Sequence, residues 1–261
     1  MPCLAADGKN ARFPGSLIHY GSANVEACMQ SLGEGYGAAV LGASGGIGRA
    51  IAQLLESDPN CARVYRLSRR GEIAFDLTDE ASLAQAAERL RRETTSVSLI
   101  FNATGVLDRH GYLPEKSLSM MEAQAMNDSF AINATGPALI LKHFHTLLPR
   151  SGKSVLAFLS ARVGSIGDNR IGGWYSYRAS KAALNQIVRT GAIEMARKRK
   201  DCVCVALHPG TVATGLSKPY AGSRPVQAPL ESAEQMLQVI DGLDASQSGR
   251  FFTFDGKMVE W

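Results

Sequence analysis

The sequence predicts an α/β fold, in which a doubly wound parallel sheet forms a single domain. Short apolar runs typical of buried strands alternate with helical patterns from residue 38 to the end of the chain. A glycine-rich segment, residues 42–48, joins the first apolar run to the first helical pattern. The chain has 261 residues, 45% of them hydrophobic and 20% charged, which is enough for one sizeable core.

Seven apolar runs have the length and boundaries expected of strands. They are residues 38–41, 64–67, 73–75, 97–102, 155–160, 203–207 and 251–254. Helical spacing predicts helices after residue 47, over residues 81–92, over residues 120–148 up to Pro149, and over residues 175–199. Because strands and helices alternate, the strands are expected to be parallel with helices on both faces.

Residues 1–36 precede the first predicted strand and form an N-terminal extension to which no role is assigned. Within it, residues 22–32 could form a short helix closed by Gly33. The domain itself is expected to span residues 37–261.

The formal net charge of +4 comes from basic residues scattered along the chain. The basic residues 197–200 end a predicted helix, where cations suit the helix dipole, so we interpret them as a solvated helix end and expect no nucleic acid partner. No apolar run approaches the roughly 18 residues of a membrane span. We therefore expect a cytoplasmic protein without a membrane partner.

The five cysteines are odd in number and lack the CxxC spacing. This pattern is typical of a reducing compartment. Cys202 and Cys204 would share one face of an apolar strand, where core packing is the expected role. No metal site is predicted.

The glycine-rich segment has the spacing and flanks of a dinucleotide-binding turn. Gly42 permits a tight turn, Gly46 lets the backbone approach a diphosphate, and Gly48 lets helix and strand pack closely. The first helical N–H groups would face the anion. The candidate ligand-binding residues of this turn are Gly42, Ser44, Gly45, Gly46, Ile47 and Gly48; a plain glycine-rich connection is the alternative.

Tyr177 and Lys181 lie four residues apart in a predicted helix, so their side chains point the same way. An ammonium beside a phenol favours the phenolate and lowers its pKa toward the operating pH, as a general acid or base requires. This pair alone also occurs on solvated helix faces, and it gains weight from the glycine turn.

Six motifs in order resemble the short-chain dehydrogenase/reductase family from about residue 37 to the end. They are GASGGIG at 42–48, FNATG at 101–105, FAINATG around Asn133, FLSARVG around Ser160, YRASK at 177–181 and HPGTVAT at 208–214. The segments PEKSL, HPGTVATGLSKP and the C-terminal SGRFFTFDGKMVEW resemble its C-factor-like subgroup. The resemblance implies a Rossmann fold that binds a nicotinamide dinucleotide.

After the second strand this chain has Ser68, Arg69 and Arg70. Enzymes that use the nicotinamide cofactor without a 2′-phosphate usually carry an acidic residue at this place. Cations there suit a 2′-phosphate, so NADP (NADPH) is the expected cofactor; a polar turn is the alternative. The resemblance further implies contacts from Asp76, Leu77, Asn102, Ala103, Thr104, Gly105, Pro209, Gly210, Val212 and Thr214. Asp76 could instead cap a helix, although Thr78 is better placed for that, and Pro209 and Gly210 could form a simple turn.

The resemblance implies four catalytic residues, Asn133, Ser160, Tyr177 and Lys181. Ser165 competes with Ser160, because it lies 12 residues before Tyr177 whereas Ser160 lies 17 before it. Ser160 directly follows a strand, and the residues DNRIGGW fit an insertion, so Ser160 is preferred. NATG departs from the family's NNAG at Ala103 and Thr104, so the resemblance implies the position of this strand under the cofactor more directly than the individual contacts there.

These residues predict hydride transfer between NADP(H) and a small-molecule carbonyl or alcohol. A cofactor-binding signalling protein with incidental turnover is the alternative, motivated by the C-factor resemblance. Ile187, Val188 and Ile193 spread over more than one stripe of their helix, which together with the family's habit predicts a homodimer or homotetramer.

Overall fold

The computed structural model describes residues 29–94, 96–108, 110–220, 222 and 225–261. Its centre is a seven-stranded sheet in the order β3-β2-β1-β4-β5-β6-β7, in which every neighbouring pair is parallel. The strands are β1 (Tyr36–Leu41), β2 (Cys61–Ser68), β3 (Ile73–Ala74), β4 (Leu99–Asn102), β5 (Ser154–Leu159), β6 (Cys202–His208) and β7 (Phe251–Thr253). The predicted doubly wound sheet is confirmed.

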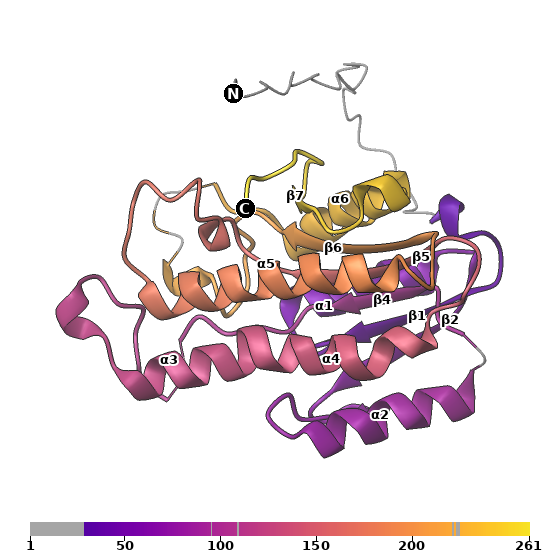
Figure 1. Cartoon of the computed structure of the whole chain (residues 1–261), viewed down its shortest axis with the longest axis horizontal. Helices are drawn as coiled ribbons and strands as arrows, with labels where there is room; N and C mark the ends of the chain where they lie inside the picture. Colours follow the sequence, from indigo (N-terminus) through magenta and orange to yellow (C-terminus); the bar gives the residue numbers. More distant parts are fainter. Residues whose placement is uncertain (1–28, 95, 109, 221, 223–224) are drawn as a thin grey trace, which may run out of the picture.

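Helices cover both faces of the sheet (Figure 1). On one face lie α1 (Gly46–Ser57) and α6 (Pro229–Gly242), and on the other lie α2 (Glu80–Glu93), α4 (Gly136–Phe144) and α5 (Tyr175–Met195). Alternate residues of β1 separate the two cores: Ala38 and Val40 face α1 and α6, whereas Ala39 and Leu41 face the other layer. Strands buried on both faces read as continuous apolar runs, which is why the sequence located them.

The helix expected over residues 120–148 is wrong as one continuous α-helix. The chain forms a 3₁₀ turn (Leu118–Met120), α3 (Ala123–Phe130), a π-helical turn (Ala131–Thr135), α4 and a second 3₁₀ turn (His145–Leu147). Pro137 has no N–H to donate to the carbonyl of Asn133, and Gly136 instead donates to Ala131 five residues back. The widened turn aims Asn133 at the interior.

The helix expected to end at residue 199 ends at Met195. Arg199 is buried rather than solvated, and its Nε donates to the carbonyl of Leu148 at 3.2 Å. Through Arg199, the basic stretch after α5 is hydrogen-bonded to the chain that follows α4. This corrects its interpretation as a solvated helix end.

The packed body begins before residue 37, where the domain was expected to start. Met29 is buried against the core, and its N–H donates to Asp58 Oδ2 at 2.8 Å. Gln30–Leu32 forms a short 3₁₀ helix, followed by Gly33 at a φ of 76°. The rest of the helix expected over residues 22–32 lies outside the described residues.

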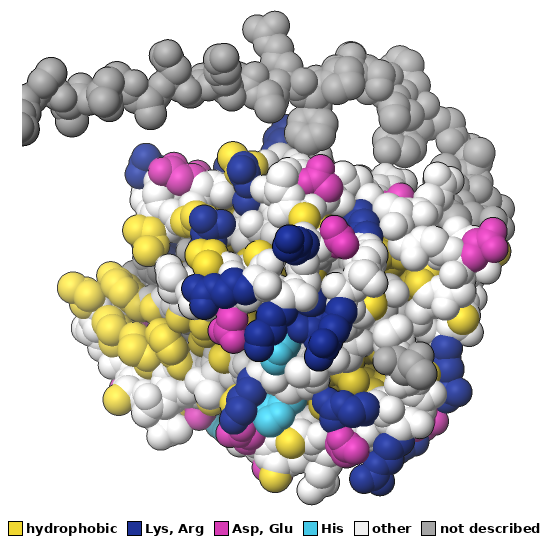
Figure 2. Space-filling view, turned by 45° about the vertical axis from the view of Figure 1, so that its right-hand side comes forward, with side chains coloured by type: hydrophobic (Ala, Val, Ile, Leu, Met, Phe, Trp, Pro, Cys, Tyr) yellow, Lys and Arg dark blue, Asp and Glu magenta, His cyan; other side chains and the backbone are white. Residues whose placement is uncertain are grey.

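The face in Figure 2 carries positive and negative side chains interspersed, with exposed hydrophobic side chains gathered on one side. Several exposed arginines are paired, as Arg66 is with Glu56 at 2.6 Å and Arg89 with Glu93 at 2.9 Å. Within the described residues, no helix has the length and apolarity to cross a membrane, and no cluster of three or more His, Cys, Asp or Glu could hold a metal.

Candidate active site

A cavity of about 820 Å³ opens at the carboxyl edge of the sheet, where the loops after β1, β4, β5 and β6 meet the start of α1 and the first turns of α5. Of the expected site residues, the following line it: Gly45, Gly46, Ile47, Gly48, Ala103, Thr104, Gly105, Ser160, Tyr177, Lys181, Pro209, Gly210, Val212 and Thr214. Strand order reverses between β1 and β4, and ligands of doubly wound sheets bind at such a switch point.

At Gly42, Gly46 and Gly48 the glycine turn leaves no room for a side chain. Gly42 has a φ of +81°, and a Cβ on Gly48 would lie 2.3 Å from the carbonyl oxygen of Gly42. A Cβ on Gly46, the first residue of α1, would lie 2.8 Å from Thr214 Cγ2. Gly45, Gly46 and Gly48 line the cavity beside Ile47, so the N-terminus of α1 forms a glycine-rich cradle that fits the diphosphate of a dinucleotide.

The turn after β4 is held by the residues that depart from the family pattern. Thr104 donates to Asn102 Oδ1 from its Oγ1 at 2.7 Å and from its N–H at 3.2 Å. Asn102 is fully buried behind the cavity, and its Nδ2 has no partner within the described residues. A Cβ on Gly105 would lie 3.3 Å from both Asn133 Oδ1 and Lys181 Nζ, so the chain passes between these two groups.

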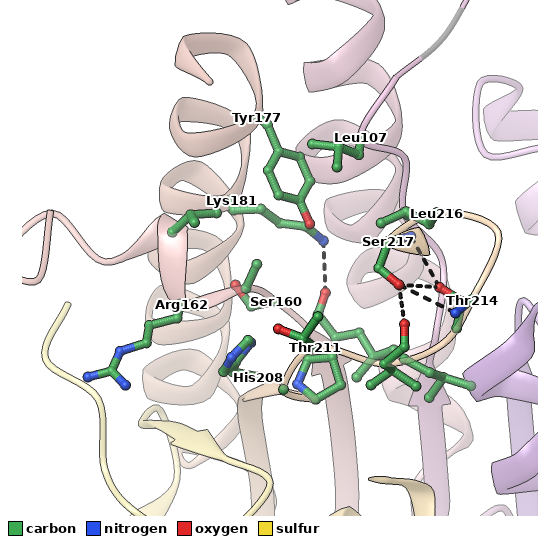
Figure 3. A pocket seen from close by; sticks show the side chains of 18 of the residues that line it. Leu107, Ser160, Arg162, Tyr177, Lys181, His208, Thr211, Thr214, Leu216 and Ser217 are labelled. Atoms are coloured by element: carbon green, nitrogen blue, oxygen red, sulfur yellow. Dashed lines mark hydrogen bonds between the residues drawn. The ribbon is translucent and has the colours of Figure 1, made fainter. Parts of the chain in front are cut away.

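Tyr177 and Lys181 extend into the cavity from α5 (Figure 3), and Lys181 Nζ lies 5.9 Å from the centre of the Tyr177 ring. Lys181 is buried and donates to the carbonyl of Leu159 at 2.9 Å. Burial lowers the pKa of Lys181 to about 7 and raises the pKa of Tyr177 above its usual value. The expected lowering of the Tyr177 pKa is thus wrong for this environment: desolvation outweighs the neighbouring amine and keeps the phenol protonated.

Ser160 follows β5 and lines the cavity, whereas Ser165 does not. The Oγ of Ser160 donates to Asn185 Oδ1 at 2.6 Å, and both residues are buried. Ser165 is buried in the loop beyond, where its Oγ accepts from the N–H of Asp168 at 3.1 Å. The geometry favours Ser160 as the serine that can meet a ligand.

Asn133 lies behind the cavity rather than in its wall. Its Oδ1 accepts from the N–H of Val106 at 2.9 Å, and its Nδ2 donates to the carbonyl of Val106 at 2.9 Å. Nδ2 also reaches Ser129 Oγ at 3.3 Å and Ser180 Oγ at 3.2 Å. This buried network connects the π-helical turn to α5 one residue before Lys181.

The loop after β6 closes the cavity opposite α5. Gly210 has a φ of +80°, and a Cβ there would lie 2.9 Å from the ring of Phe254. Thr214 Oγ1 and Ser217 Oγ are 3.1 Å apart, and Ser217 also bonds the carbonyl of Val212 (Figure 3). Pro209, Gly210, Val212 and Thr214 thus belong to one internally bonded loop.

Nine expected residues lie outside the cavity lining: Gly42, Ser44, Asn102 and Asn133, and five residues at or after the ends of β2 and β3. Ser68 ends β2 beside β1 and is buried, and Arg69 and Arg70 form an exposed turn at the same edge of the sheet. Asp76 Oδ1 accepts from both the N–H and the Oγ1 of Thr78. Leu77 packs against Gly136 in the core.

The helix after Asp76 is capped by neither Asp76 nor Thr78. Asp79 is the N-cap of α2, and its Oδ1 accepts from the N–H of Ala81 at 2.9 Å. Thr78 is instead the donor in the turn that Asp76 closes, so the alternative role of helix capping falls to neither residue.

Sequence reasoning missed an aromatic wall over Tyr177. The Trp174 ring makes edge contacts with Tyr177 at 6.2 Å and with Tyr220 at 5.8 Å between ring centres, and all three line the cavity. Trp174 adopts the left-handed conformation, with a φ of 54°, just after Gly172 and Gly173 at φ 68° and 66°. The adjacent glycines were the available signal for this unusual entry into α5.

Comparisons with known proteins agree with this geometry. The family model for short chain dehydrogenases matches residues 37–224. The chain belongs to this family. Membership makes it an oxidoreductase with a fold that binds a nicotinamide cofactor.

Two curated relatives carry names of different kinds, a dehydrogenase and a signal protein. The 1-hydroxy-2-glutathionyl-2-methyl-3-butene dehydrogenase of Rhodococcus sp. (strain AD45) is 33% identical over 191 residues, which cover 73% of this chain and 80% of that protein. The C-signal protein of Myxococcus xanthus is 40% identical over 136 residues, 52% of this chain and 78% of that protein. The C-factor-like resemblance is confirmed.

Solved structures share the fold. An NADPH-bound carbonyl reductase from chicken fatty liver superposes with a TM-score of 0.78 at 24% identity, covering 92% of this chain and all of that one. The carbonyl reductase Sniffer of D. melanogaster has a TM-score of 0.76 at 22% identity, covering 87% of this chain and all of that one.

Proposed function

We propose that this protein is an NADP(H)-dependent short-chain oxidoreductase that transfers hydride between nicotinamide and a carbonyl or alcohol substrate. One observation carries the proposal: Tyr177, Lys181 and Ser160 line the same cavity as the glycine-rich N-terminus of α1. A Cβ at Gly42, Gly46 or Gly48 would crowd neighbouring atoms. Without these side chains, the turn fits a diphosphate that approaches its backbone N–H groups.

The residues of the cavity divide the chemistry between them. When bound, NADPH supplies the hydride. Burial raises the pKa of Tyr177 above its ordinary value, so the phenol is protonated at neutral pH and can donate its proton to the oxygen of the carbonyl as that oxygen gains charge. Ser160 orients the same oxygen. Lys181, as an ammonium, stabilises the phenolate that forms when Tyr177 gives up its proton. Asn133, held by its buried network behind the cavity, is proposed to hold water that links Lys181 to solvent.

The preference for NADP rests on the turn after β2. Arg69 and Arg70 are exposed there, at the edge where β1 ends and α1 begins, and the loop carries neither Asp nor Glu before Glu72. Two guanidinium groups suit a 2′-phosphate. The chicken fatty liver carbonyl reductase binds NADPH, and a short-chain dehydrogenase/reductase of Burkholderia multivorans with a similar fold binds NADP, which supports the same choice.

The substrate is proposed to be a small molecule with an apolar body. Leu107, Ile171 and Leu216, together with Trp174 and Tyr220, give the cavity lining apolar and aromatic surface. A homodimer or homotetramer in the cytoplasm stays a prediction. Exposed Ile193 on α5, with 49% of its surface accessible, is an apolar residue that assembly through this helix would cover.

A second candidate is a signalling or regulatory protein that binds the cofactor and turns over only incidentally. The 40% identity to the C-signal protein over half of this chain favours it. The two candidates differ in one measurement: the signalling protein would bind NADPH yet reduce carbonyl substrates at most at an incidental, low rate.

The experiment is to incubate the purified protein with NADPH and a panel of aldehydes, ketones and quinones while following cofactor absorbance. Alcohols with NADP, including a glutathione-conjugated alcohol suggested by the Rhodococcus relative, test the reverse direction. Binding without turnover on any of these would favour the signalling candidate.

Tyr177→Phe tests the mechanism once a substrate is found. The ring and its contact with Trp174 remain, but the proton donor is lost, so kcat should fall about 100- to 10,000-fold, or about 3–5 kcal/mol of barrier. NADPH affinity should survive. Tyr175→Phe is the matched control, because Ala179 lies four residues on and supplies no cation. Near wild-type turnover by Tyr177→Phe would exclude the mechanism.

A further inference from the structure

Ser160 has a buried partner that the proposed chemistry has not yet used. Its Oγ donates to Asn185 Oδ1 at 2.6 Å, and the exposed fractions of the two residues are 4% and 3%. Asn185 does not line the cavity, so it lies behind Ser160 rather than beside a ligand. The N–H of Ser160 is fixed separately, by the carbonyl of Leu207 at 2.8 Å. The contact with Asn185 therefore concerns the hydroxyl.

The direction of that hydrogen bond matters for a carbonyl substrate. A serine hydroxyl has one proton, and a carbonyl oxygen can only accept. While Ser160 donates to Asn185, it has no proton left for a substrate oxygen. For Ser160 to donate a hydrogen bond to that oxygen, Asn185 must donate a hydrogen bond to Ser160 instead of accepting one.

The amide of Asn185 can do this without moving its backbone. Its Nδ2 is buried and has no hydrogen-bond partner in the part of the chain that the structure describes. A half-turn of the amide exchanges the positions of Oδ1 and Nδ2. Nδ2 then donates to Ser160 Oγ, and the hydroxyl of Ser160 is free to donate its own hydrogen bond into the cavity. The unpartnered N–H, which is costly when buried, then gains an acceptor.

The helix explains why this residue is at hand. Asn185 lies one turn beyond Lys181 and two turns beyond Tyr177, so all three share one face of α5. We propose that Asn185 is a positioning residue that sets the direction of the Ser160 hydroxyl. In the free protein it accepts a hydrogen bond from this hydroxyl, and when a carbonyl binds it donates a hydrogen bond to the hydroxyl oxygen. This inference rests on the proposed function, because it assigns a role within that reaction.

Two substitutions separate this role from simple packing. Asn185→Leu is close in size and removes both hydrogen-bonding groups. Ser160 can then still donate to a substrate, but no hydrogen bond fixes the direction of its hydroxyl. Asn185→Asp, when ionised, can only accept, so it holds the serine proton away from the substrate. We expect kcat to fall about tenfold in Asn185→Leu and as far as in Ser160→Ala in Asn185→Asp. NADPH affinity, measured by fluorescence titration, should not change.

A double-mutant cycle gives the deciding readout. If Asn185 acts through Ser160, then Asn185→Leu should cost nothing further in the Ser160→Ala background. An equal loss of kcat with and without Ser160, or full activity in Asn185→Asp, would overturn the inference. Asn185→Leu and Ser160→Ala keep the cycle decisive if the buried carboxylate of Asn185→Asp prevents folding.

Failure of the inference and failure of the proposed function look different. A wild-type protein that reduces a carbonyl, and loses this activity in Tyr177→Phe, establishes the reaction first. Independent, multiplicative losses in that active enzyme then overturn only the role of Asn185. A wild type that binds NADPH but reduces nothing overturns both.

Discussion

The protonation state of Lys181 links the burial of one side chain to ligand binding. Burial lowers its pKa from the ordinary 10.5 to about 7, so the side chain is an ammonium below pH 7 and an amine above it. An anionic cofactor attracts the ammonium and raises its pKa, so binding takes up a proton at higher pH. By linkage, NADPH affinity should then fall as pH rises through the pKa of the free protein.

We expect the Kd for NADPH to rise roughly tenfold between pH 7 and pH 8.5. Fluorescence titration across that interval measures it, above the range in which the cofactor phosphate itself titrates. Lys181→Met keeps the length of the side chain without its charge and should flatten the pH dependence. A Kd that is constant in the wild type over this interval would mean that the amine is charged throughout or does not face the cofactor.

Arg69 tests the proposed cofactor preference. If its guanidinium pairs with a 2′-phosphate, wild-type protein should bind NADPH more tightly than NADH, and Arg69→Ala should lose about 10- to 100-fold of that preference. Affinities for both cofactors, measured in both proteins, decide the matter. Arg63→Ala is the control, since Arg63 is also exposed on β2 but near the opposite end of the strand. Equal wild-type affinities for the two cofactors would contradict the assignment.

At the scale of elements, the junction of β1 and α1 depends on a missing side chain. Gly48 lies inside α1, where alanine would ordinarily stabilise the helix by about 1 kcal/mol. Here a Cβ would lie 2.3 Å from the carbonyl oxygen of Gly42, which is backbone and cannot rotate away. Relieving that overlap requires α1 to move away from β1, and steric overpacking of this kind costs about 1–3 kcal/mol or more.

We therefore expect Gly48→Ala to lower the free energy of unfolding in spite of its better helix propensity. Gly45→Ala is the matched control in the same turn: Gly45 has a φ of −76°, and its Cβ would lie an ordinary 3.4 Å from the same oxygen. Urea denaturation of the three proteins compares them. A Gly48→Ala protein as stable as the wild type would show that the helix can shift freely.

The elements also show what a sequence can and cannot predict. The strands and the glycine turn were predictable because period and turn chemistry are local properties. The π-helical turn at Asn133 depends on Pro137 and on a partner, Val106, that is 27 residues away. The same holds for Asn185, whose hydrogen bond to Ser160 spans 25 residues, and for Arg199, which bonds Leu148 across 51. Tertiary contacts of this kind leave no periodic trace.

At the scale of the whole molecule, the two edges of the sheet have separate tasks. The carboxyl edge holds the cavity, whereas Asp58 follows the far end of α1 at the opposite edge. Asp58 is buried; its Oδ2 accepts from the N–H of Met29 and from the hydroxyl of Tyr36, each at 2.8 Å. This carboxylate joins residue 29 and the start of β1 to the end of α1.

Removing that acceptor should destabilise the fold without touching the cavity. In Asp58→Ala the buried donors of Met29 and Tyr36 lose their partner, which should lower the free energy of unfolding by about 3 kcal/mol. Asp241→Ala is the control, because Asp241 also accepts from the N-terminal segment, at Ser31, but in an exposed setting where the loss should be at most about 1 kcal/mol. Chemical denaturation measures both, and NADPH titration below the unfolding transition should return wild-type affinity for each. Equal stability losses in the two variants would mean that burial does not strengthen the Asp58 contacts, and a weakened NADPH affinity in Asp58→Ala would mean that the two edges of the sheet are coupled.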